Sequence, residues 1–176
     1  MLFRSHDEVS PRAEALLYAA DRAHHVETLI RPALERGEIV ITDRYLDSSI
    51  AYQGAGRVLS PGEVGRISRW ATESLIPTLT IIIDLPSEIG LGRLKSRDRL
   101  ERESLDFHER VRQEFLSMAL LDPERYLVID GRQSIEDLNR AIVDRVMELR
   151  DLNKIEKKPK IKKRIIKKPH LRKKSK

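Results

Sequence analysis

Residues 38–57 read EIVITDRYLDSSIAYQGAGR, in which a short apolar run passes directly into a cluster of polar side chains. The apolar part, residues 38–43, has no polar alternation, which is typical of a strand buried on both faces of a parallel sheet. Two further runs have the same form, LTIIID at residues 79–84 and RYLVIDG at residues 125–131. Each run carries an aspartate at its carboxyl end. We therefore predict three parallel strands.

Helical patterns fill the sequence around these runs. Apolar residues recur at helical spacing, and Ser10 and Gly37 mark the start and end of the first helix. Pro32 is predicted to kink or divide that helix. A charged stretch interrupts the third pattern. Alternating strands and helices indicate an α/β fold with a parallel sheet. The predicted helices cover residues 10–37, 60–75, 87–121 and 134–150.

The charge of the chain is divided unevenly. Of 34 Lys and Arg residues, 13 lie from residue 154 onward, with a single acid there, so residues 1–153 keep 21 basic and 27 acidic residues. The basic character thus belongs to the end of the chain, and the rest is not a basic nucleic-acid-binding domain. We predict one domain at residues 1–152 and a disordered basic tail at residues 153–176.

The amino-acid composition excludes several further classes of site and of cellular location. The chain has no cysteine, so it forms no disulfide framework and no cysteine metal site. Neither a secretory signal nor an apolar run long enough to cross a membrane is visible. A cytoplasmic protein without a membrane partner is expected.

The polar part of the opening stretch is where we expect the functional site. Ligands of open parallel sheets sit beyond the carboxyl ends of the strands. There Arg44 can grip a phosphate with its guanidinium fork, and Asp43 can orient it or help to hold a metal-bound water. Alternatively, Asp43 and Arg44 pair with each other or cap the next helix. Neutral hydrogen-bonding groups of the kind that read a sugar and base follow, at Ser48, Ser49, Tyr52 and Gln53.

The segment DRYLDSSIAYQGAGR resembles the signature of bacterial thymidylate kinases. SPRAEALLYAADRA, IRPALERG, LIPTLTIIIDLP, DRLERESLDFHERVRQEF and DPERYLVIDG also look like that family, in its order. The resemblance implies a P-loop NTPase-like fold, of the nucleoside monophosphate kinase type. It also implies transfer of the γ-phosphoryl group of ATP to thymidine monophosphate (dTMP), with Mg²⁺, in a protein that commonly dimerises through helices. Trp70 suits such an interface or a plain core equally well.

The resemblance also implies roles for single residues. Tyr18 would stack on the thymine ring, and Arg22 would donate to a thymine carbonyl from the same helix face. Alternatively, this pair is a core tyrosine beside a solvated arginine. Arg44 would hold the phosphate of dTMP with Asp43 beside it, and Tyr52 would exclude a ribose 2′-hydroxyl. The remaining binding residues implied are Ser49 at the base edge, Gln53 near the sugar and base, and Ser48 beside them in the chain.

A lid over ATP corresponds to residues 93–103. In the bacterial family, lid arginines stabilise charge on the transferring phosphoryl group. The candidates are Arg93, Arg97 and Arg99. This segment is a few residues shorter than the common bacterial lid. The alternative is a solvated helix face carrying charges of both signs.

The family's phosphate-binding loop, G-x-x-x-x-G-K-[ST], does not occur in the 176 residues. We therefore expect a chain that enters the family sequence partway, without the first βαβ portion and without a secure metal ligand. Two functions stay open. The chain is a thymidylate kinase whose activity depends on a loop supplied from elsewhere. Alternatively, it is a non-catalytic remnant or binding protein whose basic tail contacts nucleic acid.

Overall fold

The sheet has two parallel strands in the part of the chain that the computed structural model describes, residues 9–56, 59–93 and 100–156. Strand β1 (Thr80–Asp84) pairs with β2 (Tyr126–Asp130), so that Ile82 lies opposite Val128. Both strands were predicted from their apolar runs, and these predictions are confirmed. Helices precede, separate and follow the strands, as expected of the α/β class.

The prediction of a strand at residues 38–43 is wrong. This segment forms no strand, and the side chains of Ile39 and Ile41 are 75% and 93% exposed. A strand requires a neighbour that satisfies its backbone N–H and C=O groups. Within the described residues, β1 pairs with β2 alone, and residues 38–43 add no strand to the sheet. Apolar composition without a paired edge therefore leaves this segment irregular.

The first predicted helix forms as three consecutive pieces. Helix α1 (Pro11–His25) begins at Ser10, whose Oγ accepts a hydrogen bond from the N–H of Ala13 at 3.4 Å. A π-helical turn, η1 (Val26–Ile30), joins it to α2 (Arg31–Glu35). Pro32 has no N–H and crowds the preceding turn, and the wider π turn lies where that strain falls. Gly37 follows in a left-handed conformation with φ of 77°.

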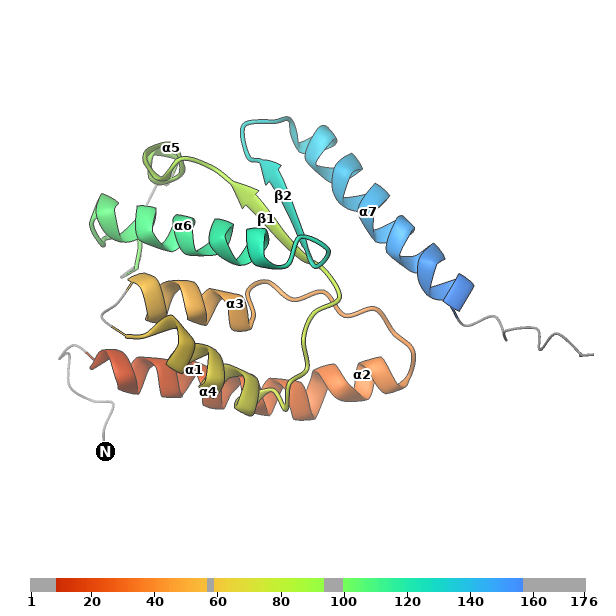
Figure 1. Ribbon diagram of the computed structural model, residues 1–176, viewed down its shortest axis with the longest axis horizontal. Coiled ribbons are helices and arrows are strands. Elements are labelled where there is room, and N and C mark those ends of the chain that lie inside the picture. Colours follow the sequence, from red (N-terminus) through yellow and green to blue (C-terminus); the bar gives the residue numbers. More distant parts are fainter. Residues whose placement is uncertain (1–8, 57–58, 94–99, 157–176) are drawn as a thin grey trace, which may run out of the picture.

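The elements stack in layers (Figure 1). Helices from the first half of the chain form the lower layer, and α6 lies between them and the sheet. Helix α7 covers the other side of β2 and extends to Glu156, past the domain boundary expected at residue 153. The bounds of α6, α7 and the other elements not yet given are α3 (Leu46–Ser49), η2 (Ile50–Gly56), α4 (Pro61–Ala71), α5 (Ser87–Gly92), α6 (Leu105–Leu121) and α7 (Ile135–Glu156).

Close packing of α6 on the π-helical segment η2 positions the polar stretch described above. Ala51, Phe107 and Val111 form a buried cluster between these two elements. A Cβ at Gly56 would lie only 2.7 Å from Phe107 Cε2 and 2.9 Å from Val111 Cγ2. Glycine at this position is therefore what lets the two helices approach each other.

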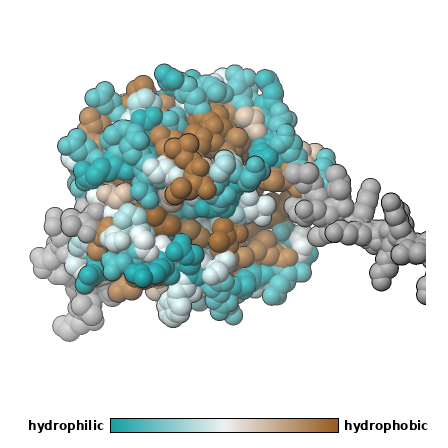
Figure 2. All heavy atoms as spheres, in the orientation of Figure 1, coloured by the Kyte–Doolittle hydropathy of each residue, from teal (hydrophilic) through white to brown (hydrophobic). Residues whose placement is uncertain are grey.

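Much apolar surface stays uncovered. Figure 2 shows apolar side chains over both the upper half of the molecule, which holds the sheet, and the lower helical layer. Ile83 of β1 is 54% exposed, and Leu120 and Leu121 at the end of α6 are more exposed still. Among the described residues, no helix combines the length and the apolar character that crossing a membrane requires.

Candidate functional site

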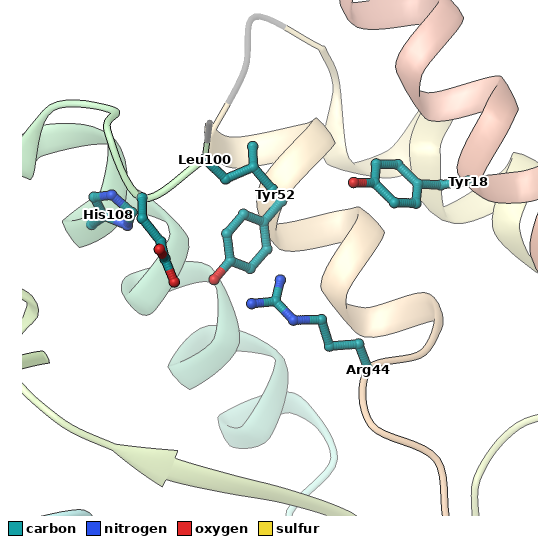
Figure 3. Close-up of a pocket in the computed structure, with 6 residues that line it drawn as sticks. Tyr18, Arg44, Tyr52, Leu100 and His108 are labelled. Atoms are coloured by element: carbon teal, nitrogen blue, oxygen red, sulfur yellow. The ribbon is translucent and has the colours of Figure 1, made fainter. Parts of the chain in front are cut away.

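A cavity of about 260 Å³ opens between the helical layer and α6. Its walls come from α1, from the loop that precedes α3, from η2, and from α6 with the turn that precedes it (Figure 3). Four segments that are distant in the sequence therefore meet at one place. The lining residues are Tyr18, Arg44, Tyr52, Leu100, Glu101 and His108.

Arg44 is the cation of this cavity. Its backbone is left-handed, with φ of 62°, a conformation that is uncommon for a residue with a side chain and that often marks functional sites. The guanidinium carbon lies 4.7 Å from the centre of the Tyr52 ring, a cation–π contact. The side chain is exposed, so its N–H groups are directed at a space that a ligand can enter.

Neither alternative role of Asp43 and Arg44 is present. Both residues are described, yet they form no ion pair with each other, and α3 begins after Tyr45 without a side-chain cap. Asp43 is exposed and lies next to the cavity-lining Arg44 in the chain.

Tyr52 forms the wall against which Arg44 rests. Its ring contacts Phe107 and Phe115 of α6 at centroid distances of 6.2 and 6.3 Å, with tilted and edge-on geometries. Aromatic pairs of this geometry fix ring orientation as well as burying area. The Tyr52 ring is thus held between an apolar cluster and a cation.

One turn beyond Tyr18, Arg22 contacts Ser49. Arg22 Nη2 donates to Ser49 Oγ at 2.9 Å, and the guanidinium also lies 5.7 Å from the Tyr45 ring centre. Arg22 Nη1 is buried and has no hydrogen-bond partner among the described residues. Burial lowers the pKa of Arg22, although Tyr45 and Asp21 oppose this effect. An unpartnered buried donor beside Ser49 is ready to bind an acceptor.

Four of the predicted binding residues lie outside the cavity wall, namely Arg22, Ser48, Ser49 and Gln53. Gln53 is buried, and its Nε2 donates to Glu14 Oε1 at 3.1 Å, so its amide joins η2 to α1. Ser48 lies in the first turn of α3, where its N–H donates to the Tyr45 carbonyl.

The carboxyl edge of the sheet collects a second set of charged groups. Arg93 Nη1 donates to the Gly131 carbonyl at 3.2 Å, just beyond β2. Arg112 of α6 holds Asp84 with two hydrogen bonds of 2.7 and 2.9 Å, which keep the pKa of Asp84 below its usual value. Of the three lid candidates, Arg97 and Arg99 lie outside the described residues.

Asp47, which the sequence did not single out, anchors the polar stretch. It is 3% exposed and accepts hydrogen bonds from Arg125 Nη1 and Nη2, both at 3.1 Å, and from the Tyr126 hydroxyl at 2.7 Å. Thr80 at the start of β1 also donates to it at 3.3 Å. One carboxylate therefore ties α3 to the first residues of both strands.

Sequence analysis also missed part of the cavity wall. Leu100 and Glu101 lie in the turn before α6, and His108 lies in its first turn. The helical pattern around residues 100–110 gave no sign of which side faces η2, because that contact is tertiary. The charged run RDRLERE at residues 97–103, which only Leu100 interrupts, was the one local signal in this part of the sequence.

The arrangement suits a small anionic ligand with a planar part. Arg44 provides a fixed positive charge below the Tyr52 ring, and Tyr18 provides an aromatic ring on the opposite side of Tyr52 from His108 (Figure 3). Arg22, one turn beyond Tyr18 on α1, and its hydrogen-bond partner Ser49 add directed hydrogen-bonding groups.

Comparison with known proteins points the same way. The sequence profile of the family described as thymidylate kinase matches residues 1–142. The thymidylate kinase of Clavibacter michiganensis is 56% identical over 145 residues, which are 80% of this chain and 69% of that protein. The thymidylate kinase of Clavibacter sepedonicus is 61% identical over 127 residues, 70% of this chain and 60% of that protein.

A more distant relative, the thymidylate kinase of Pediococcus pentosaceus, is 44% identical over 149 residues, 82% of this chain and 71% of that protein. The matched region thus spans about 60 to 71% of the length of these relatives.

Proposed function

The chain belongs to the thymidylate kinase family, and on this premise we propose that its cavity binds dTMP as the acceptor of a phosphoryl group from ATP. In the reaction, an oxygen of the dTMP phosphate bonds to the γ-phosphorus of ATP as the bond to ADP breaks. The products are thymidine diphosphate and ADP. The observation that carries the proposal is the convergence of Tyr18, Arg44 and Tyr52 on one cavity.

Arg44 is assigned to the phosphate of dTMP. A guanidinium donates two parallel hydrogen bonds to a phosphate, and such charge-assisted bonds are about twice as strong as neutral ones. The left-handed backbone and the Tyr52 ring hold the guanidinium in place before a ligand arrives. Asp43, the neighbouring residue in the chain, is assigned to orienting that group.

The base is assigned to the end of the site near Tyr18. Stacking on Tyr18 fits a planar pyrimidine, and Arg22 Nη1 has an unused donor for a thymine carbonyl. Ser49, already bonded to Arg22, would contact the base edge, with Ser48 and Gln53 supporting this region from behind. The Tyr52 ring would occupy the space of a ribose 2′-hydroxyl and so favour deoxyribose.

The ATP side of the reaction rests on the family alone. The described residues contain no group of three or more acidic or histidine side chains arranged to hold a metal ion, and the sequence has no phosphate-binding glycine loop. These residues therefore do not fit Mg²⁺ or the ATP phosphates. We propose that Arg93, Arg97 and Arg99, as a group, stabilise the negative charge of the transferring phosphoryl group in the transition state. We also propose that turnover depends on a phosphate-binding loop outside these 176 residues.

The proposal separates binding from turnover, so the first test measures both. Calorimetric titration of residues 1–176 with dTMP should give saturable binding, while ATP-to-dTMP transfer should need an added segment that carries the glycine loop. Arg44→Gln should weaken dTMP binding about tenfold or more. Arg36→Gln, which removes an exposed arginine paired with Glu38, is the matched control. Absence of dTMP binding to the unaltered chain would refute the proposal.

A second copy of the chain is the partner we propose for the face formed by α1, η1 and α4. Trp70 is 83% exposed there, and Leu29 is 57% exposed. Exposed large apolar side chains grouped on packed helices are typical of protein interfaces. Trp70→Ser should shift the sedimentation equilibrium toward the monomer, whereas an unchanged equilibrium would remove Trp70 from the interface.

The basic end of the chain supports a second, non-catalytic function. Thirteen Lys and Arg residues from residue 154 onward would give salt-dependent contact with a nucleic-acid backbone in the cytoplasm. The tail has no aromatic residue for base stacking, so no sequence preference is expected. Binding to single-stranded DNA should fall steeply with salt and be lost on deletion of residues 157–176. Binding that survives the deletion would place the contact in the folded part.

A further inference from the structure

His108 is a cavity residue without an assigned role. It lines the same cavity as Arg44 and Tyr52, and its ring stands edge-on to Phe107 at a centroid distance of 5.3 Å and an interplanar angle of 89°. Its Nε2 atom is buried and has no hydrogen-bond partner within the described ranges of the chain. A buried nitrogen without a hydrogen-bond partner destabilises the protein, unless a bound ligand forms that hydrogen bond.

The position of His108 indicates which part of a ligand it meets. In Figure 3, Tyr18 and His108 lie on opposite sides of Tyr52, and the Arg44 guanidinium lies below the Tyr52 ring between them. A nucleotide with its base at Tyr18 therefore directs its other end, the phosphate, toward Arg44 and His108.

We propose that His108 Nε2 carries a proton and donates a hydrogen bond to a phosphate oxygen of the bound nucleoside monophosphate. Arg44 and His108 then hold the phosphate from two segments, the loop before α3 and the first turn of α6. This inference rests on the proposed function, because it takes the ligand of the cavity to be dTMP. It adds that α6 recognises the phosphate and contributes little to recognition of the nucleoside.

Two ligands and two variants separate phosphate recognition from a structural role. We would titrate the full chain with dTMP and with thymidine, which lacks the phosphate. His108→Leu removes the donor and should weaken dTMP binding about 10- to 100-fold, while thymidine binding changes less than about twofold. His108→Gln places an amide N–H near the Nε2 position and should restore most of the dTMP affinity. His24→Leu, on the exposed side of α1, is the matched control and should leave both affinities unchanged.

A spectroscopic measurement on the unaltered chain avoids dependence on the folding of a variant. The imidazole carbon resonance of His108, identified by its loss in His108→Gln, should shift on addition of dTMP but not of thymidine. The resonances of His24 and His25 should stay in place. The inference would be overturned if His108→Leu lowered the affinities for dTMP and thymidine equally, or if the His108 resonance did not shift on addition of dTMP. If the unaltered chain binds no dTMP, the proposed function falls as well, so the two failures are distinguishable.

Discussion

Arg125 holds the carboxylate of Asp47 with two hydrogen bonds of 3.1 Å across 78 positions of sequence. The pair lies away from the cavity, yet it fixes the helix that follows Arg44 to the start of β2. Burial and the neighbouring Asp47 carboxylate also raise the pKa of Tyr126 above its usual range. The same contacts that locate the strand therefore locate the polar stretch that contains Arg44 and Tyr52.

Loss of the Asp47 carboxylate is expected to destabilise the whole domain. Asp47→Ala leaves the Arg125 guanidinium and the Tyr126 hydroxyl buried without their acceptor, at a cost of about 3 kcal/mol in the free energy of unfolding. Urea denaturation followed by circular dichroism measures this. Asp144→Ala, on the exposed side of α7, is the control. Equal small losses for both variants would mean that the network contributes little.

Close approach of α6 and η2 predicts a size limit at Gly56. Gly56→Ala brings a Cβ to within 3 Å of Phe107 and Val111, and should lower the free energy of unfolding by about 1 to 3 kcal/mol. Because Tyr52 lies on the displaced segment, dTMP affinity should fall in the same variant. Gly62→Ala, where the nearest atom is Ser60 Oγ at 3.7 Å, should be tolerated. A stable Gly56→Ala protein with normal dTMP affinity would contradict the packing described.

The Arg112–Asp84 pair predicts a pH dependence of stability. Hydrogen bonds from Arg112 hold the pKa of Asp84 below its usual value. The stabilisation is therefore complete above the ordinary aspartate pKa of about 4 and is lost as pH falls through the lowered value. Asp84→Asn should destabilise the protein by about 1 kcal/mol at pH 7, and this difference should shrink below pH 4. A difference that stays constant down to pH 3 would show that the ion pair is not its source.

The environment of Arg22 predicts a trade-off between the stability of the free protein and its affinity for dTMP. The buried, unpartnered Nη1 atom destabilises the free protein, while the contacts with Ser49 and Tyr45 offset part of that cost. Arg22→Met should change the free energy of unfolding by less than about 1 kcal/mol and weaken dTMP binding about tenfold or more. Titration calorimetry and thermal unfolding give the two quantities. A large loss of stability with unchanged dTMP affinity would make Arg22 a structural residue.

The sequence predicted the elements better than it predicted their contacts. Helical spacing located α1 and α6, and unbroken apolar runs located β1 and β2, because these signals are local. The same kind of run at residues 38–43 failed, since pairing depends on a neighbouring edge that a local pattern cannot report. For the cavity as well, local signals pointed to some of the lining residues and missed those that tertiary packing brings there.

The side chains of Tyr18, Arg44 and Tyr52 belong to motifs that are recognisable in the sequence, and all three line one cavity. His108 and Glu101 join them only through the packing of α6 on η2, which no spacing rule predicts. Gln53 resembles its polar neighbours in the sequence, yet its amide is used inside the protein by Glu14.

Residues 38–42 have a consequence for the integrity of the polypeptide backbone. Proteases bind their substrates as extended, accessible segments, and this one connects two helices without regular hydrogen bonding while exposing Ile39 and Ile41. Limited digestion with an enzyme that cleaves after large apolar residues should make its first cut here. The cut would separate Tyr18 and Arg22 on one fragment from Arg44 and Tyr52 on the other, so a single nick would divide the cavity between two peptides.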